Sequence, residues 1–183
     1  MAAREATIED LYRVDGKAEL VGGELVLMSP TGGIPGFAGG EIFASLREYG
    51  RRTKAGYALP DNVGFLVRLP SRRSFSPDAA FTTQAPLTGK FIDGAPVFAA
   101  EVRSEDDDGP AAERAMAAKR ADYFAAGTMV VWDVDVLREQ LNRSSTGIDH
   151  PGSAGSASAI SPRRRSVDVT VYPVVSADPY MLR

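Results

Sequence analysis

The spacing of apolar residues changes sharply near the middle of the chain. Residues 97–102 form an apolar run without alternation, which is typical of a strand buried on both faces. Residues 110–126 repeat apolar positions at steps of three and four, as in a helix that packs along one face, and Gly127 can end it. Residues 129–134 form a second apolar run. This order predicts two parallel strands joined by a right-handed helical crossover.

The first half of the chain predicts shorter elements. Thr7 and Asp10 resemble a capping box at the start of a short helix over 8–14. Gly22-Gly23 stands between two apolar runs and predicts a hairpin. The other expected elements are the hairpin strands over 18–21 and 24–28, a helix over 37–49 that Gly50 ends, strands over 57–59, 64–69 and 79–82, a basic turn over 71–76, and a loop that contains Pro86, Gly89 and Gly94.

The C-terminal part has a different composition. Residues 143–161 are rich in Ser, Gly and Ala, and we expect a flexible insertion there. Residues 167–172 alternate with a period of two, which predicts a half-exposed edge strand. The acidic residues 105–108 and Pro110 suit the start of the following helix. We therefore expect one α/β or α+β domain over residues 1–183, built on one mixed sheet.

Composition excludes several classes of function. The chain has 183 residues, 44% of them hydrophobic, which suffices for one packed core, and its net charge of −3 is unlike that of a general nucleic-acid binder. It has no cysteine, so disulfides, thiolate zinc sites and thiol catalysis are excluded. The single histidine, His150, lies in the Ser/Gly-rich stretch and is expected to be solvated. No apolar stretch resembles a membrane span or a signal peptide, so we expect a cytoplasmic protein.

Two carboxylates lie where a charge is unfavourable. Glu101 interrupts the apolar run 97–102, and burying an unpaired carboxylate costs several kcal/mol. It must pair with a cation, bind a metal, point to a cleft, or reach solvent at the strand end. Asp78 follows Pro77 before the strand over 79–82, where it could cap its own turn. If the two strands are neighbours, about 4.8 Å apart, the two carboxylates could share one cation.

A lysine and an arginine add positive charge to this pattern. Lys119 shares the apolar face of the 110–126 helix with Tyr123, so it either extends to the edge of that face or reaches a polar site. Glu113 and Arg120 lie on other faces of the helix, where we expect surface charges.

Arg103 stands two residues after Glu101, so the alternation of a strand puts both side chains on the same side. A guanidinium in that position could bind a phosphate through two hydrogen bonds.

Four segments, in this order along the chain, resemble those of a known family: AELVGGELVLMSP, SPDAAF, APVFAAEVRS and KRADYFAAGTMVVWDVD. The chain resembles the Uma family of restriction-endonuclease-like proteins, within the PD-(D/E)XK nuclease superfamily, over most of its length. The resemblance implies a restriction-endonuclease-like α/β fold with a central mixed sheet flanked by helices. It also implies that Asp78, Glu101 and the backbone carbonyl of Val102 bind Mg²⁺ or Mn²⁺.

The chain departs from the family pattern in two places. The superfamily lysine normally stands two residues after the acid, where this chain has Arg103. Related proteins carry the lysine on the following helix, which would give its role to Lys119. Glu41 would be an outer partner of the metal. The region before Glu41 also lacks the histidine that relatives often have there.

Two functions from different classes follow. The first is Mg²⁺-dependent hydrolysis of phosphodiester bonds in DNA, catalysed by Asp78, Glu101 and Lys119, with Arg103 positioning a phosphate. The second is a catalytically inactive module of the same fold that binds nucleic acid or a protein partner. An unrelated small-molecule enzyme is a third alternative. A homodimer is a further option, by analogy with nucleases that cut both strands.

Overall fold

The structure is a computed structural model, and it describes residues 4–85, 87–105, 109–136 and 140–145. The expected edge strand over 167–172, most of the expected insertion over 143–161, and residues 106–108 of the acidic stretch lie outside this part. Within it, none of the helices has the length and apolar character needed to cross a membrane.

A five-stranded mixed sheet forms the centre of the fold, in the order β10-β9-β8-β6-β3. Its strands are β3 (Tyr57–Pro60), β6 (Ala79–Thr82), β8 (Phe98–Val102), β9 (Val130–Asp135) and β10 (Gln140–Ser145). The two apolar runs pair in parallel as β8 and β9, so the predicted crossover is confirmed, while the other neighbours in the sheet are antiparallel. β10 includes residues 143–145, which we had expected to be part of the flexible insertion.

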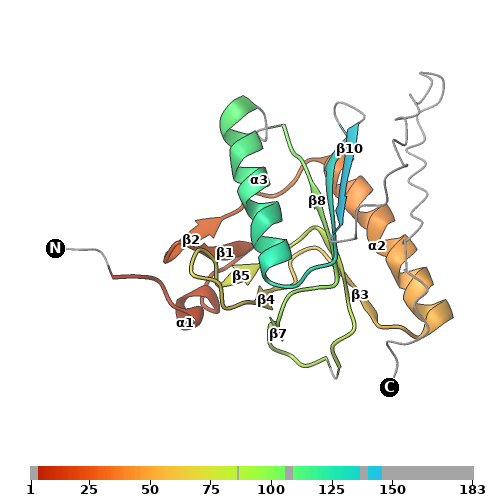
Figure 1. The fold of residues 1–183 in the computed structure, drawn as a ribbon, viewed down its shortest axis with the longest axis horizontal. Coiled ribbons are helices and arrows are strands. Elements are labelled where there is room, and N and C mark those ends of the chain that lie inside the picture. The colour runs from red at the N-terminus through yellow and green to blue at the C-terminus, as the bar shows by residue number, and fades with distance from the viewer. Residues whose placement is uncertain (1–3, 86, 106–108, 137–139, 146–183) are drawn as a thin grey trace.

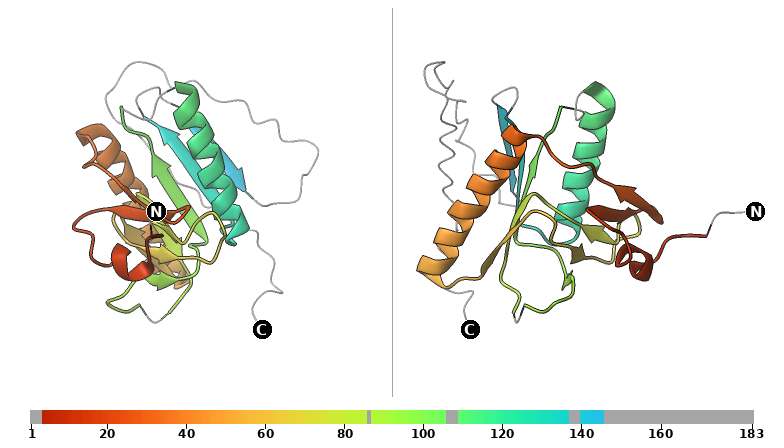
Figure 2. Two further views of the ribbon diagram at one scale, coloured as in Figure 1. Left: turned by 90° about the vertical axis from the view of Figure 1, so that its left-hand side faces the viewer. Right: turned by 180° about the vertical axis from the view of Figure 1, so that it is seen from behind.

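Two long helices cover the two faces of this sheet (Figures 1 and 2). α2 (Gly33–Thr53) packs Ile42 and Leu46 against Phe81 and Trp132. α3 (Gly109–Ala125) lies on the opposite face and buries Tyr123 completely. The residues of β8 therefore divide between two environments: Ala100 and Val102 point toward α2, and Glu101 points toward α3.

Short elements lie beside α3 on the same face of the central sheet. They are the helix α1 (Ile8–Leu11), the hairpin of β1 (Ala18–Val21) and β2 (Glu24–Leu27), and a three-stranded sheet of β5 (Ser74–Phe75), β4 (Phe65–Leu66) and β7 (Ile92–Asp93). The ring of Phe75 stacks on Tyr123 at 3.8 Å between centroids. The capping box of Thr7 and Asp10 and the glycine turn of the hairpin are both confirmed.

Several local predictions were wrong. The 71–76 segment is not a turn throughout, because β5 lies within it, and its Arg72 is buried. The strand expected over 64–69 is shorter, since β4 covers Phe65–Leu66 alone. The loop expected around Pro86, Gly89 and Gly94 contains the strand β7.

Gly50 does not end its helix, because α2 continues to Thr53 and Lys54 caps it in the left-handed conformation. A Cβ at Gly50 would lie 2.9 Å from the carbonyl oxygen of Gly56 and 3.1 Å from the ring of Phe81. The glycine is needed for close packing.

Candidate active site

Asp78 is hydrogen-bonded to the neighbouring strand β8, and its carboxylate accepts a hydrogen bond from that strand. Its backbone N–H donates to the carbonyl of Ala100 at 3.0 Å, which joins the start of β6 to β8. The N–H of Val102 donates to Oδ2 of Asp78 at 2.6 Å, and Nζ of Lys17 donates to Oδ1 at 2.6 Å. Both carboxylate oxygens therefore have strong donors, and the carboxylate lies next to the backbone that carries Glu101.

Glu101 is buried on the α3 side of the sheet. The hydroxyl of Tyr123 donates to Oε1 at 2.6 Å, and Nζ of Lys119 donates to Oε2 at 2.8 Å. Of the alternatives that the sequence left open, Glu101 pairs with a cation and does not reach solvent. Loss of water on burial is the largest effect on the pKa of Glu101. Together with the negative charges of Asp78 and Glu19, it raises that pKa to about 7 against the opposing effect of the Lys119 charge.

Lys119 reaches a polar site, as one of the alternatives predicted. Its ammonium lies 2.8 Å from Oε2 of Glu101 and 2.9 Å from Oε1 of Glu19. Burial by itself would lower the pKa of Lys119, but these two carboxylates outweigh it and raise the pKa. The side chain is therefore a permanent cation at neutral pH, suited to stabilising negative charge rather than to accepting a proton.

The sequence interpretation missed Glu19, which is 2% exposed in β1. It accepts hydrogen bonds from Arg72, from the backbone N–H of Ser76 at 2.8 Å, and from Lys119. Burial would raise the pKa of Glu19, but Lys119 and Arg72 lower it overall, so it remains ionised. The signal was present in the sequence, because Glu19 interrupts the apolar run AELV as Glu101 interrupts its own.

Lys17 was also missed, and no spacing rule would have found it. Its ammonium lies between Asp78 at 2.6 Å and Asp61 at 2.7 Å, just before β1. Burial opposes its charge, but Asp78 and Asp61 outweigh burial and raise the pKa of Lys17, with a smaller contribution from Glu101. A cation thus already contacts Asp78, one of the two carboxylates that the resemblance assigned to a metal.

Arg103 shares the α3 side with Glu101, as alternation predicted, but it is engaged by carboxylates. Its guanidinium donates two hydrogen bonds of 2.6 Å to Asp133, which is completely buried, and it also contacts Glu113. Arg120 donates to the same Asp133 at 2.5 Å. Glu113 is exposed, as expected of a surface charge, and Arg120 is partly exposed, but both also belong to this ion network.

A small hollow of about 150 Å³ reaches Asp78 from the α2 side. Its wall on α2 consists of Pro35, three glycines and Phe43, and Asp61 and Asp78 line its other side. Glu41 is exposed on α2 and is not among the residues that line this hollow. Glu41 is therefore not part of the hollow that reaches Asp78.

The carboxylate oxygens of Asp78 and Glu101 are donor atoms of the kind that a hard cation prefers. The residues that the structure describes contain no group of three or more His, Cys, Asp or Glu side chains placed to hold a metal ion. Mg²⁺ needs only one or two carboxylates, because it keeps several of its waters. Asp78 and Glu101 offer such oxygens, and Lys17 and Lys119 balance their charge in this structure.

A family comparison fits this geometry. The Uma2 family, described as "Putative restriction endonuclease", matches residues 6–169. The chain belongs to the Uma2 family. The resemblance drawn from the four sequence segments is confirmed, and the Uma2 assignment covers Asp78, Glu101 and Lys119 alike.

A solved structure supports the fold. The chain is similar to the crystal structure of a putative nuclease belonging to DUF820 from Anabaena variabilis, with a TM-score of 0.65 and 12% sequence identity. The similarity covers 78% of this chain and 81% of the other. The predicted mixed α/β fold of the nuclease type is therefore confirmed. No curated protein matches the chain.

Proposed function

We propose that this Uma2 protein hydrolyses phosphodiester bonds in DNA with the help of Mg²⁺ or Mn²⁺. One observation carries the proposal: Lys119 contacts Glu101 at 2.8 Å, while Asp78 accepts the N–H of the residue after Glu101. These contacts support the proposal, because they place Asp78 beside the backbone that carries Glu101, and Lys119 beside the Glu101 carboxylate. The description of the family as restriction endonucleases supports a nuclease activity.

The proposed roles follow from the contacts. Asp78, Glu101 and the carbonyl of Val102 would hold the metal, which when bound supplies an activated water and neutralises charge on the phosphate. Lys119 supplies a second positive charge close to Glu101. The hydroxyl of Tyr123 fixes the orientation of Glu101 through its hydrogen bond of 2.6 Å.

Arg103 needs an exchange of partners to bind a phosphate. Its contact with Asp133 is buried, but the side chain of Glu113 is 52% exposed and can move away into water. A phosphate would then replace Glu113 on the outer edge of the guanidinium. This places Arg103 at the rim of the proposed site rather than at its centre.

Cleavage of plasmid DNA tests the proposal. We expect nicking or linearisation with Mg²⁺ or Mn²⁺, its loss on chelation, and its loss in Asp78→Ala. Glu24→Ala is a matched control, because Glu24 is an exposed acid at the start of β2. Equal nicking by the wild-type protein and Asp78→Ala would reject the assignment.

The pairing of both acids with lysines in this structure favours one alternative, an inactive module that binds nucleic acid or a protein partner. Titration calorimetry with Mg²⁺ separates the two functions. The nuclease requires metal binding that depends on Asp78 and Glu101, and the inactive module does not. A homodimer and a cytoplasmic location remain predictions from the sequence.

A further inference from the structure

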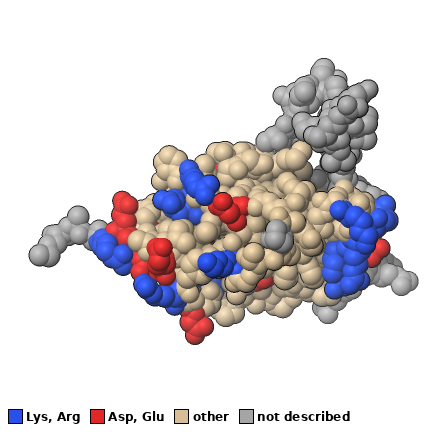
Figure 3. Space-filling view, turned by 90° about the horizontal axis from the view of Figure 1, so that it is seen from below, with Lys and Arg blue, Asp and Glu red and all other residues tan. Residues whose placement is uncertain are grey.

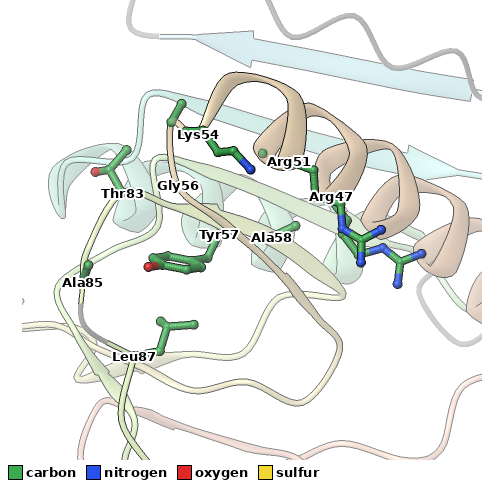
Figure 4. Close-up of a pocket in the computed structure, with 11 residues that line it drawn as sticks. Arg47, Arg51, Lys54, Gly56, Tyr57, Ala58, Thr83, Ala85 and Leu87 are labelled. Atoms are coloured by element: carbon green, nitrogen blue, oxygen red, sulfur yellow. The ribbon is translucent and has the colours of Figure 1, made fainter.

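A second and larger hollow lies away from the carboxylates, where α2 ends and β3 begins (Figure 4). Its volume is about 570 Å³, within the range of roughly 300–1,000 Å³ that is common for ligand pockets. It is lined by Arg47, Gly50, Arg51, Lys54, Ala55, Gly56, Tyr57, Ala58, Thr83, Ala85 and Leu87. Tyr57 and the proposed metal ligand Asp78 thus belong to opposite ends of the β3–β6 pair, in which Pro60 pairs with Ala79.

The rim of this hollow is positively charged. Arg47, Arg51 and Lys54 line it, and among the described residues none of the three forms an ion pair with a carboxylate. Arg52 adds another charge in the last turn of α2. Figure 3 shows Lys and Arg side chains gathered at one end of the molecule, while elsewhere on that face positive and negative groups are mixed. A chain of net charge −3 thus has a local patch of positive charge.

An aromatic ring lies within the hollow beside these charges. Tyr57 is 45% exposed, and its ring lies beside Leu87 in the close-up of Figure 4. Unpaired bases stack on such rings, while cations near them bind the phosphates of the same strand. The bases of an intact duplex are stacked on one another and cannot use the ring. Charge and aromatic surface together therefore favour a single strand over a duplex.

The hollow is connected to the proposed active site by one contact. The guanidinium of Arg47 lies over the ring of Phe43, 5.5 Å from its centroid. Arg47 lines the larger hollow, and Phe43 lines the smaller one, whose wall includes Asp61 and Asp78. The α2 wall of the smaller hollow is largely glycine, which lets a backbone approach closely. From Tyr57 to Asp61, the path along β3 is roughly 13 Å, at about 3.3 Å per residue.

We propose that the larger hollow binds a single strand of DNA, with phosphates at Arg47 and Arg51 and a base on Tyr57. The strand then continues along α2 toward Asp78. Only this last step, the arrival of the strand at the carboxylates, depends on the proposed nuclease function. Binding in the hollow requires neither metal nor cleavage.

Binding without metal tests the site directly. Fluorescence anisotropy of labelled oligothymidine, in EDTA, measures the Kd of the wild-type protein, of Tyr57→Ala and of Arg47→Gln/Arg51→Gln. We expect Tyr57→Ala to weaken binding by about 5-fold to 100-fold. The arginine pair should reduce the slope of log K against log salt by about 1.4. The matched control is Lys90→Gln/Arg114→Gln, which removes the same charge from exposed positions elsewhere and should leave both values unchanged. Thermal unfolding verifies that each variant folds.

Two results would overturn the site: equal Kd values for all these proteins, or binding of a duplex of the same length as tightly as the single strand. If binding follows our expectation but no cleavage occurs with Mg²⁺ or Mn²⁺, the proposed function fails and the binding site stands. If cleavage occurs, the arginine pair should raise KM for single-stranded DNA and leave kcat nearly unchanged. An unchanged KM would show that the strand reaches Asp78 by another path.

Discussion

The N–H of Val102 donates to Oδ2 of Asp78 at 2.6 Å. Because Val102 directly follows Glu101, this bond fixes the Asp78 carboxylate beside the backbone of the second proposed metal ligand. The donor is a backbone N–H, so every substitution of Val102 except proline leaves it in place.

Replacing Asp78 by Asn should abolish most of the cleavage activity and leave the fold nearly as stable. An amide oxygen can still accept the N–H of Val102, but it carries no charge for Lys17 or for a metal. We expect the rate of plasmid cleavage to fall by about 100-fold or more, since metal assistance is lost. The free energy of unfolding should change by only about 1–2 kcal/mol. Asp93→Asn, at an exposed ion pair with Arg68, is the control and should cleave at the wild-type rate.

Lys17 should compete with the metal for Asp78. Its ammonium lies 2.6 Å from Asp78 and 2.7 Å from Asp61, so a divalent cation must displace it or share its partners. We expect Lys17→Met to bind Mn²⁺ at least about tenfold more tightly, because repulsion between two close cations is removed. Calorimetry measures the affinity, with Lys90→Met as the control. Weaker binding of Mn²⁺ by Lys17→Met would mean that Lys17 positions Asp78 for the metal and does not compete with it.

The sequence predicted the parts of the fold that depend on regular spacing. The crossover of β8, α3 and β9 follows from two apolar runs around an amphipathic helix, and Lys119 could be placed on the buried face of α3 by counting. Glu101 was recognisable because a charge in a buried run requires a partner. These features depend on residues close together in sequence.

The ion network could not be predicted in the same way. Arg72 looks like part of a polar turn, yet it pairs with Glu19, 53 positions earlier in the chain. Lys17 and Asp78 are 61 positions apart. Such pairs form only when the β1–β2 hairpin packs beside β5 and α3, and no local pattern encodes that packing. Arg103 was placed on the correct side of β8, but its partner Asp133 belongs to the neighbouring strand.

The raised pKa of Glu101 should make stability depend on pH. Burial raises the pKa to about 7 from an ordinary value of 4.5. Between these values the folded state holds a proton that the unfolded state has released. The free energy of unfolding should therefore fall as pH rises from 5 to 7, by at most about 1.4 kcal/mol per pH unit. Glu101→Gln removes this titration, so its urea-unfolding profile should be flatter over that range. Parallel profiles for the two proteins would contradict the burial of Glu101.

Lys119 should contribute more to stability than an ordinary lysine. Its ammonium is shared by Glu19 and Glu101, so Lys119→Met leaves two buried carboxylates without it. We expect a loss of about 3–5 kcal/mol in the free energy of unfolding at pH 8. Adding Glu101→Gln to Lys119→Met should restore part of this loss, because one of the two charges is removed. Arg114→Met, an exposed change on the same helix, should stay within about 0.5 kcal/mol of wild type. A double variant that is no more stable than Lys119→Met would refute the shared pairing.

Two glycines of α2 should respond to alanine in opposite directions. At Gly50 an added Cβ would lie 2.9 Å from the carbonyl oxygen of Gly56 and 3.1 Å from the ring of Phe81, so the helix must shift away from the sheet. We expect Gly50→Ala to lower the free energy of unfolding by about 1–3 kcal/mol. At Gly40 no atom lies within 4 Å of the added Cβ, and alanine should stabilise the helix by about 0.5–1 kcal/mol. Urea unfolding measures both. Stabilisation by Gly50→Ala would show that α2 does not pack on β3 and β6 as closely as described.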